Sequence, residues 1–392
     1  MDFRWSADAD AFRTEVRRFI DDTLPAGWYE MNLDEAEEFQ YAGPIQKKLA
    51  ANRWRIMHWP LEYGGLGFSL WRQLILSEEF TYRRMPGSAD AGAHPVAALL
   101  MHSGTPAQRS RFMGPIARAE VKFCLLFTEP AAGSDLASLQ TRAVEDGDDY
   151  VINGQKVFNT GAHLADWGLL AARTDQEVPK HKGISLFMVD MKAPGVTVRP
   201  LINLTGAHAQ NEVFLDDVRV PRDSIIGEEN QGWYQLASSL STERSGVTGI
   251  NRFALCKRLL DDLTGFARSA SMNGRNVGKR PEVRARLAEA AIATEVGRFI
   301  LYRAVWMNDN GLDSTRVNSA SKIFGGELAQ RLANTGVSMM GLYGQLQRGT
   351  KHAPLQGAIE RLYRETVYFT IGLGTSEVNR NVIAQRGLGL PR

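Results

Sequence analysis

A central block of short apolar runs separates two helix-like regions of this chain. Between residues 121 and 230 the runs are bounded by Gly, Pro, Asp or Asn, which is typical of strands and turns. They read VKFCLLF, YVINGQKVF, WGLLAAR, GISLFMVDM, GVTVRPLI and NEVFLDDVRV. Within YVINGQKVF, the dipeptide Asn153-Gly154 predicts a hairpin turn. The block therefore predicts a central domain of antiparallel strands, as a meander or a small barrel.

The two flanking regions favour helices. Near the N-terminus Phe12, Val16, Phe19 and Ile20 share one face of an amphipathic helix, and Ser6 precedes it as a candidate N-cap. The glycine-rich stretch WPLEYGGLGF predicts a tight loop after the first helices.

Near the C-terminus the run RARLAEAAIATEVGRFILYRAVW consists mostly of good helix formers, and a helix of this length usually packs in a bundle. We therefore expect an α+β protein with a helical domain over 1–120, the β-domain over 121–230 and a helical domain over 231–392.

Composition excludes several classes of protein. The chain has 392 residues, 44% hydrophobic and 23% charged, and a net charge of +2, so nothing indicates nucleic-acid binding. No apolar run approaches the ~20 residues of a membrane helix, and the polar N-terminus is unlike a signal peptide, so we expect a cytoplasmic protein. Cys124 and Cys256 lie in apolar runs as expected for buried thiols, and no metal-binding spacing is present.

Common cofactor and nucleophile motifs are absent from the sequence. There is no GxGxxG after a strand, no P-loop and no GxSxG elbow. The most informative stretches are FTEPAAGSDLASLQTRA at 127–143 and INGQKVFNTGA at 152–162. With WPLEYGGLG, GWYQLASSLSTER, GRNVGK and GTSEVNR they follow one another in an order that resembles the acyl-CoA dehydrogenase family over nearly the whole chain.

This resemblance implies a fold, a cofactor and a reaction. The implied C-terminal domain is a four-helix bundle, and the implied assembly is a homotetramer or a heterotetramer with a paralogue. The implied cofactor is FAD, lying between the β-domain and the C-terminal helices, and the substrate is an acyl-CoA thioester. A base removes the α-proton while the β-hydride passes to flavin N5, and electron-transfer flavoprotein is the implied partner.

The flavin ring is expected to contact residues of the central domain. The resemblance places Leu126, Phe127 and Thr128 along the pyrimidine side of the ring. Phe158 stands at the aromatic position beside the isoalloxazine, where the family usually has Trp, and Thr160 stands at the position that faces N5.

The phosphates, the adenosine end and CoA are assigned in the same way. Ser134 matches a serine near the flavin phosphate and the CoA pyrophosphate, and Arg244 matches an arginine beside CoA. Arg275 resembles an arginine that reaches the FAD pyrophosphate of a neighbouring subunit, where a bidentate guanidinium suits a phosphate. Thr375 and Glu377 match positions near the adenosine half of FAD.

One glycine-rich motif departs from the family pattern. The family's QxxGGxG appears here as SMMGLYG, which keeps Gly341 and Gly344 but has Leu342 between them. We therefore expect contacts with the AMP end of FAD to differ in detail.

The second departure concerns the catalytic base. Many members carry it in a YEGTS-like run, but here the run is Gly372-Leu373-Gly374-Thr375-Ser376, and leucine cannot accept a proton. A branch that includes isovaleryl-CoA dehydrogenase places the Glu before an Arg on another helix, and LSTERSGV supplies Glu243 there. We expect Glu243 to be the base, since function needs the carboxylate near the proton and not at a fixed sequence position.

The residues at positions 372 and 373 also predict the kind of acyl group that the substrate carries. The Leu373 N–H remains available for the thioester oxygen, and Gly372 in place of an aromatic predicts room for a branched or ring-bearing acyl group. Two alternatives stay open: a non-catalytic FAD-binding subunit that partners an active paralogue, and a relative with different CoA-thioester chemistry, such as a desulfinase or an oxidase.

Overall fold

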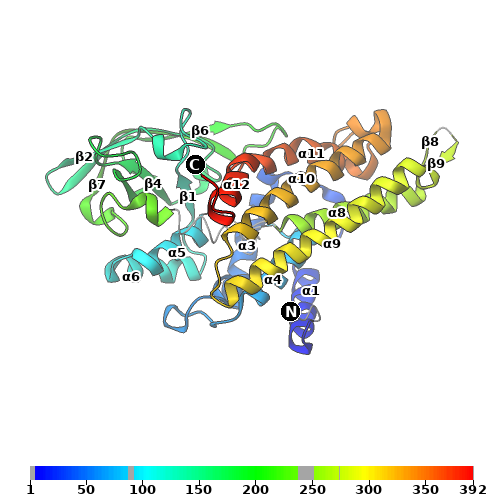
Figure 1. Cartoon of the computed structure of the whole chain (residues 1–392), viewed down its shortest axis with the longest axis horizontal. Coiled ribbons are helices and arrows are strands. Elements are labelled where there is room, and N and C mark those ends of the chain that lie inside the picture. The colour runs from blue at the N-terminus through cyan, green and yellow to red at the C-terminus, as the bar shows by residue number, and fades with distance from the viewer. Residues whose placement is uncertain (1–4, 87–91, 237–250, 273, 392) are drawn as a thin grey trace. The chain divides into compact units, whose positions relative to one another are not determined.

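The computed structural model describes residues 5–86, 92–236, 251–272 and 274–391. The chain divides into two compact units. Unit 1 comprises 1–34, 68–88 and 244–392, and unit 2 comprises 35–67 and 89–243. Figure 1 shows helices on both sides of the β-region along the chain, which confirms the α+β class and the order of helices, sheet and helices.

Unit 2 is built on a 7-stranded sheet. Its strands are β1 (Phe123–Leu126), β2 (Arg142–Asp146), β3 (Asp149–Lys156), β4 (Trp167–Arg173), β5 (Ile184–Asp190), β6 (Val196–Leu201) and β7 (Gln210–Pro221). The order is β1-β4-β2-β3-β7-β6, and β5 pairs with the other edge of β4. β4 runs parallel to both β1 and β2, so the expectation of a purely antiparallel domain is wrong. Barrel closure stays a prediction.

The prediction of a hairpin turn at Asn153-Gly154 is also wrong. β3 runs through both residues, with a register shift against β7 between Ile152 and Gly154. The hairpin lies earlier, where Gly147 adopts a φ of 67° between β2 and β3. A Cβ atom on Gly154 would lie 2.3 Å from Thr141 Oγ1, so this glycine permits a close approach of β3 to the residue before β2.

Helices cover the sheet of unit 2. They are α3 (Glu35–Ala51), α5 (Ala93–Ser103) and α6 (Pro106–Ala117). α6 begins with a capping box, in which Thr105 and Gln108 satisfy each other's backbone N–H groups. One apolar core joins α5, α6, β4 and β5, and Phe112 lies edge-on to both Phe123 and Trp167 within it. In the loop before α4 the expected tight turns are present at Gly64 and Gly67, which both have positive φ.

Unit 1 is helical. Its longer helices are α1 (Ala7–Thr23), α4 (Leu70–Tyr82), α8 (Arg252–Ser269), α9 (Pro281–Asp309) and α10 (Thr315–Met340). The shorter elements are α2 (Trp28–Met31), β8 (Ser271–Met272), β9 (Arg275–Asn276), α11 (Ala358–Glu365) and α12 (Ser376–Val382). Ser6 caps α1 as predicted, accepting from the N–H of Ala9 at 3.2 Å. α8, α9 and α10 share one apolar core, and the four-helix count stays a prediction.

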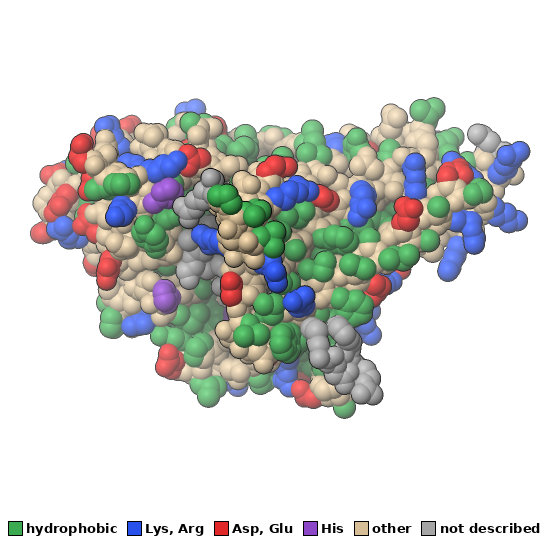
Figure 2. All heavy atoms as spheres, in the orientation of Figure 1, with side chains coloured by type: hydrophobic (Ala, Val, Ile, Leu, Met, Phe, Trp, Pro, Cys, Tyr) green, Lys and Arg blue, Asp and Glu red, His purple; other side chains and the backbone are tan. Residues whose placement is uncertain are grey.

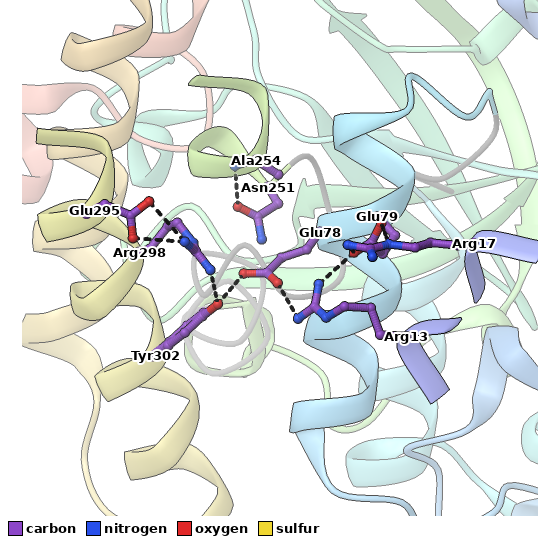
Figure 3. A network of polar contacts seen from close by, with 9 residues as sticks. All are labelled: Arg13, Arg17, Glu78, Glu79, Asn251, Ala254, Glu295, Arg298 and Tyr302. Carbon is purple, nitrogen blue, oxygen red and sulfur yellow. Dashed lines mark hydrogen bonds and ion pairs between the residues drawn. The ribbon is translucent and has the colours of Figure 1, made fainter. Parts of the chain in front are cut away.

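Ion pairs and hydrogen bonds join three helices of unit 1 (Figure 3). Arg13 of α1 bridges Glu78 and Glu79 of α4 at 2.9 and 2.7 Å. Tyr302 of α9 donates to Glu78 at 2.9 Å, and Arg298 donates to the Tyr302 hydroxyl at 2.8 Å. Such a network fixes the relative register of α1, α4 and α9, because breaking one pair would leave a buried charge without compensation.

Both cysteines are buried free thiols, as expected. Burial raises the pKa of each thiol to about 12, so neither is a reactive thiolate at neutral pH. In the described part of the chain no helix is both long and apolar enough to span a membrane, and no cluster of metal-binding side chains is found.

Candidate functional site

The loop after β3 presents an exposed aromatic ring in an unusual backbone conformation. Phe158 has a φ of 61° and its side chain is 57% exposed. A bulky residue in the left-handed region costs about 1–2 kcal/mol, so the surrounding structure must hold it there. The hydroxyl of Thr160, two residues on, makes no hydrogen bond within the described residues. A flat apolar ring beside a free hydroxyl fits the binding of an aromatic cofactor.

The end of β1 offers backbone groups and one side chain to the same region of the sheet. The side chains of Leu126 and Phe127 point into the core, so only their peptide groups face outward. The Thr128 carbonyl accepts from the N–H of Val157 at 2.9 Å, which ties β1 to the end of β3. The N–H and hydroxyl of Thr128 have no partner among the described residues and can serve a ring with polar edges.

A buried ion pair supports this segment from behind. Lys156 is 0% exposed and its ammonium donates to Glu129 Oε1 at 2.8 Å and to the Phe127 carbonyl at 3.1 Å. The Glu129 carboxylate also accepts from the N–H groups of Gln140 and Thr141 at 2.6 and 2.9 Å. These bonds connect the end of β1, the end of β3 and the start of β2.

The pKa values of the pair reflect burial and mutual attraction. Burial lowers the pKa of Lys156 to about 8, although the Glu129 charge works in the opposite direction. Burial alone would raise the pKa of Glu129, but Lys156 and the hydrogen bonds lower it below its ordinary value. The pair is therefore ionised at neutral pH and serves to position Phe127 and Thr128.

A polar cavity of about 520 Å³ opens at Ser138, four residues beyond Ser134 in the chain. Ser134 itself is exposed, and the next residue, Asp135, pairs with Lys180 at 2.7 Å. The cavity is rich in cationic and amide side chains, which suits an anionic ligand. Its lining consists of Ser138, Gln140, Arg142, Arg173, Gln176, Val178 and Lys180.

In unit 1 the slot around residue 373 has a shape that the sequence did not predict. Leu373 has a φ of 59°, and its N–H makes no hydrogen bond within the described residues. A Cβ atom on Gly372 would lie within 2.3 to 2.8 Å of the Tyr368 ring. The predicted room at Gly372 is therefore filled in part by Tyr368, from one turn earlier in the chain.

The residues after this slot begin α12. The Thr375 hydroxyl accepts from the Val378 N–H at 3.1 Å and so caps the helix. Glu377 is exposed in the first turn, 3.7 Å from Arg380, which pairs with Glu327 of α10 at 2.6 Å. The Glu377 backbone N–H and the Thr375 side chain both lower the pKa of the Glu377 carboxyl by hydrogen bonding to it.

Arg275 lies on β9 at the end of α8, where Lys and Arg side chains gather (Figure 2). It is exposed and has no ion pair within the described residues. Gly341, with a φ of 57°, lies beside the same β8–β9 hairpin, since a Cβ atom there would lie 3.5 Å from Met272 Cε. The structure thus brings Arg275 and the glycine motif to one end of unit 1. Leu342 is 82% exposed.

The proposed base, Glu243, and its neighbour Arg244 lie outside the described residues. Among the described residues the buried carboxylates are Glu78, Glu79 and Glu129. All three are ion-paired, as Figure 3 shows for the first two, so none is available to take a proton from a substrate.

Sequence reasoning missed the ion pair of Lys156 and the ring of Tyr368. Strand alternation gave a signal for the first, because Lys156 shares parity with the buried Tyr150 and Ile152. For Tyr368 the signal was its spacing of four residues from Gly372, which is one helical turn.

Comparison with known proteins gives the class of this protein, an oxidoreductase. Models of the acyl-CoA dehydrogenase N-terminal, middle and C-terminal domains match residues 6–120, 124–218 and 230–388. The chain is 36% identical to the acyl-CoA dehydrogenase FadE29 of Mycobacterium tuberculosis (strain ATCC 25618 / H37Rv), over 85% of this chain and 84% of that protein.

Solved structures agree with these matches. The Tcur3481–Tcur3483 steroid ACAD is 33% identical, with a TM-score of 0.90 and coverage of 100% of both chains. The ChsE4–ChsE5 complex from Mycobacterium tuberculosis is 30% identical, with a TM-score of 0.87 and the same coverage. The chain belongs to the acyl-CoA dehydrogenase family, and its cofactor is FAD.

Proposed function

We propose that the protein desaturates the α,β-bond of an acyl-CoA thioester, with Glu243 as the base. The observation that carries this proposal is the slot at residue 373, which has a free backbone N–H and no carboxylate. FAD, when bound, supplies the hydride acceptor. Leu126, Phe127, Thr128, Phe158 and Thr160 are proposed to hold the flavin ring.

Glu243 is proposed to take the α-proton. The buried carboxylates of the described residues are all engaged in ion pairs, which leaves a role for a carboxylate elsewhere in the chain. A bound acyl chain that excludes water would raise the pKa of such a carboxylate toward neutrality, as a base of this kind needs.

The free N–H of Leu373 is proposed to donate to the thioester oxygen. Charge develops on this oxygen as the α-proton leaves, and a preorganised donor stabilises it by several kcal/mol in a dry site. This role needs only the backbone, so it is independent of the side chain at position 373.

The acyl group is proposed to be branched or ring-bearing. Leu373 and the ring of Tyr368 lie at this slot, where the resemblance implies a carboxylate and an aromatic at positions 373 and 372. A structural relative is described as a steroid ACAD, which agrees with a ring-bearing substrate. Tyr368 is then the residue that limits the size of the ring.

CoA is proposed to place its phosphates near Ser134 and Arg244. The polar cavity lined by Ser138, Arg142 and Lys180 begins four residues beyond Ser134 in the chain, and its cationic side chains suit the nucleotide end of CoA. For FAD, we propose that Thr375 and Glu377 contact its adenosine half, and that Gly341 and Arg275 lie near its phosphates, with Arg275 reaching a neighbouring subunit.

The domain boundaries near 120 and 230 and the assembly also remain proposals. A homotetramer and a heterotetramer with a paralogue both fit, and the ChsE4–ChsE5 complex is a relative with two different chains. Electron-transfer flavoprotein is the proposed electron acceptor.

Replacing Glu243 by Gln tests the proposal. We expect a folded, yellow protein whose flavin is no longer bleached by an acyl-CoA, with activity lower by about three orders of magnitude or more. Glu289→Gln is the matched control, since it removes an exposed carboxylate of α9 that has no proposed role in the site, and it should keep turnover. Near-normal turnover of Glu243→Gln, with Glu289→Gln also active, would refute Glu243 as the base.

A further inference from the structure

A buried asparagine holds the loop that carries Phe158 and Thr160. Asn211, at the start of β7, is 0% exposed. Its backbone carbonyl accepts from the Asn159 N–H at 3.0 Å, and its side-chain Nδ2 donates to the Asn159 carbonyl at 3.0 Å. Asn159 lies between Phe158 and Thr160, and both its N–H and its carbonyl are hydrogen-bonded to Asn211.

Two further bonds fix the same loop. The Asn159 side chain donates to the Leu125 carbonyl of β1 at 2.8 Å, and the Gly161 N–H donates to the Ala209 carbonyl at 2.9 Å. The left-handed backbone of Phe158 costs free energy, and these bonds over-determine the conformation. Among these bonds, the one from Asn211 Nδ2 is made by a side chain of β7.

Two stacked histidines set the orientation of the Asn211 amide. His208 Nε2 lies 2.8 Å from Asn211 Oδ1, and His163 Nδ1 lies 3.1 Å from Asn211 Nδ2. The His163 and His208 rings are stacked, with centroids 4.1 Å apart.

Since Nδ2 already donates to Asn159, its second hydrogen meets an acceptor at His163 Nδ1 and Oδ1 meets a donor at His208. The observed arrangement therefore requires a His163 ring that is not protonated at Nδ1.

We propose that Asn211 is a positioning residue that holds Phe158 and Thr160 against the flavin, and that His163 and His208 keep its amide in the working orientation. The inference rests on the proposed role of Phe158 and Thr160. Asn211 is fully buried, so its effect passes through the backbone of Asn159.

Protonation of His163 would disturb this arrangement. A proton on Nδ1 would face the donating amide of Asn211, and the amide would have to turn and release Asn159. The charged and titratable groups that act on His163 are His208 and Lys122, and the aromatic ring of Phe39 on α3 lies 6.2 Å away. Burial, His208 and Lys122 each disfavour a positive charge on His163.

The test uses the FAD-loaded enzyme and the variants Asn211→Ala and Asn211→Asp. Both remove the donor to Asn159, and we expect FAD affinity to fall by about tenfold or more with a shifted visible flavin spectrum. Gln108→Ala is the control, because Gln108 is also buried and donates to two backbone carbonyls of unit 2, at 2.8 and 2.7 Å. It should lower the melting temperature and leave FAD affinity and the spectrum unchanged.

Two outcomes separate the proposals. If Thr160→Val alters the spectrum and both Asn211 variants keep wild-type FAD affinity and spectrum, Asn211 has no positioning role. If Thr160→Val and Phe158→Ala also leave both unchanged, the flavin assignment of the loop fails instead.

His163→Gln tests the histidines without removing the core asparagine. A glutamine oxygen accepts from Asn211 but does not titrate, so FAD retention should match the wild type at about pH 7.5. As the pH falls through the folded pKa of His163, which burial lowers below the ordinary value of 6.5, the wild type should lose FAD and the variant should keep it. Identical pH profiles for the two proteins would overturn the role of the histidines.

Discussion

A Cβ atom on Gly372 would lie 2.3 Å from Cε2 of Tyr368, so the phenol ring fills the space that a side chain at position 372 needs. The ring of Tyr368, four residues earlier in the chain, therefore lies where a side chain at position 372 would begin. Removal of this ring would therefore open space at the slot.

Tyr368→Ala should widen the acceptance of large acyl groups. The ring is 44% exposed, so its removal costs little stability, and we expect kcat/KM for ring-bearing acyl-CoAs to rise by about tenfold. Tyr363→Ala is the control, since Tyr363 is 45% exposed and lies one helical segment earlier. If kcat/KM changes equally for both variants across a panel of acyl-CoAs, Tyr368 does not limit the size of the acyl group.

Lys156→Met should destabilise the protein strongly. It leaves the Glu129 carboxylate buried without its counter-charge, and breaking such a pair costs about 3–5 kcal/mol. The double variant Lys156→Met/Glu129→Gln should recover part of this loss, because no buried charge remains. Urea unfolding of the three proteins measures both effects. A double variant that is less stable than Lys156→Met would contradict the explanation.

The sheet and helices were largely predictable because their periodicity is local. Phe12, Val16 and Ile20 are all buried as the helical spacing required. The parallel pairing of β1 with β4 was not predictable, since strand direction depends on contacts between segments far apart in the chain. Gly154 was misread for a related reason: it serves the approach of Thr141, which no local pattern reveals.

Part of the candidate site was predictable from the sequence, and part of it was not. Phe158, Thr160 and Leu373 could be singled out from motifs, and the structure adds the positive φ of Phe158 and Leu373. The supporting contacts of Lys156 and Asn211 come from tertiary packing, in which a polar side chain gains meaning only from its partners. No single motif contains both members of either contact.

Stability should fall on mild acidification through His163. Burial, the nearby His208 and the charge of Lys122 lower its pKa below the ordinary value of 6.5. Between the folded pKa and 6.5 the unfolded chain binds more protons, so this contribution is present above pH 6.5 and is lost as the pH falls through the folded pKa.

Urea midpoints at about pH 7.5 and pH 5 should therefore differ more for the wild type than for His163→Gln. His181→Gln is a control, because His181 packs on Trp233 away from Asn211. An equal loss in the wild type and in His163→Gln would assign the acid sensitivity to other groups.

A base restored at position 373 should rescue the loss of Glu243. The resemblance implies that both positions address the same α-carbon from different backbones. Leu373 already has a φ of 59° and is 38% exposed, so a glutamate can replace it without a new backbone strain or a buried void. We expect Glu243→Gln to be inactive and Glu243→Gln/Leu373→Glu to regain a measurable part of the turnover, by about tenfold or more over the single variant.

The matched control is Glu243→Gln/Leu373→Gln, which has the same size at position 373 but cannot accept the proton. Flavin bleaching under anaerobic conditions follows the chemical step directly. Rescue by both Glu and Gln would show that the gain in turnover comes from the shape of the side chain. Rescue by neither would show that a carboxylate at position 373 does not reach the reacting carbon.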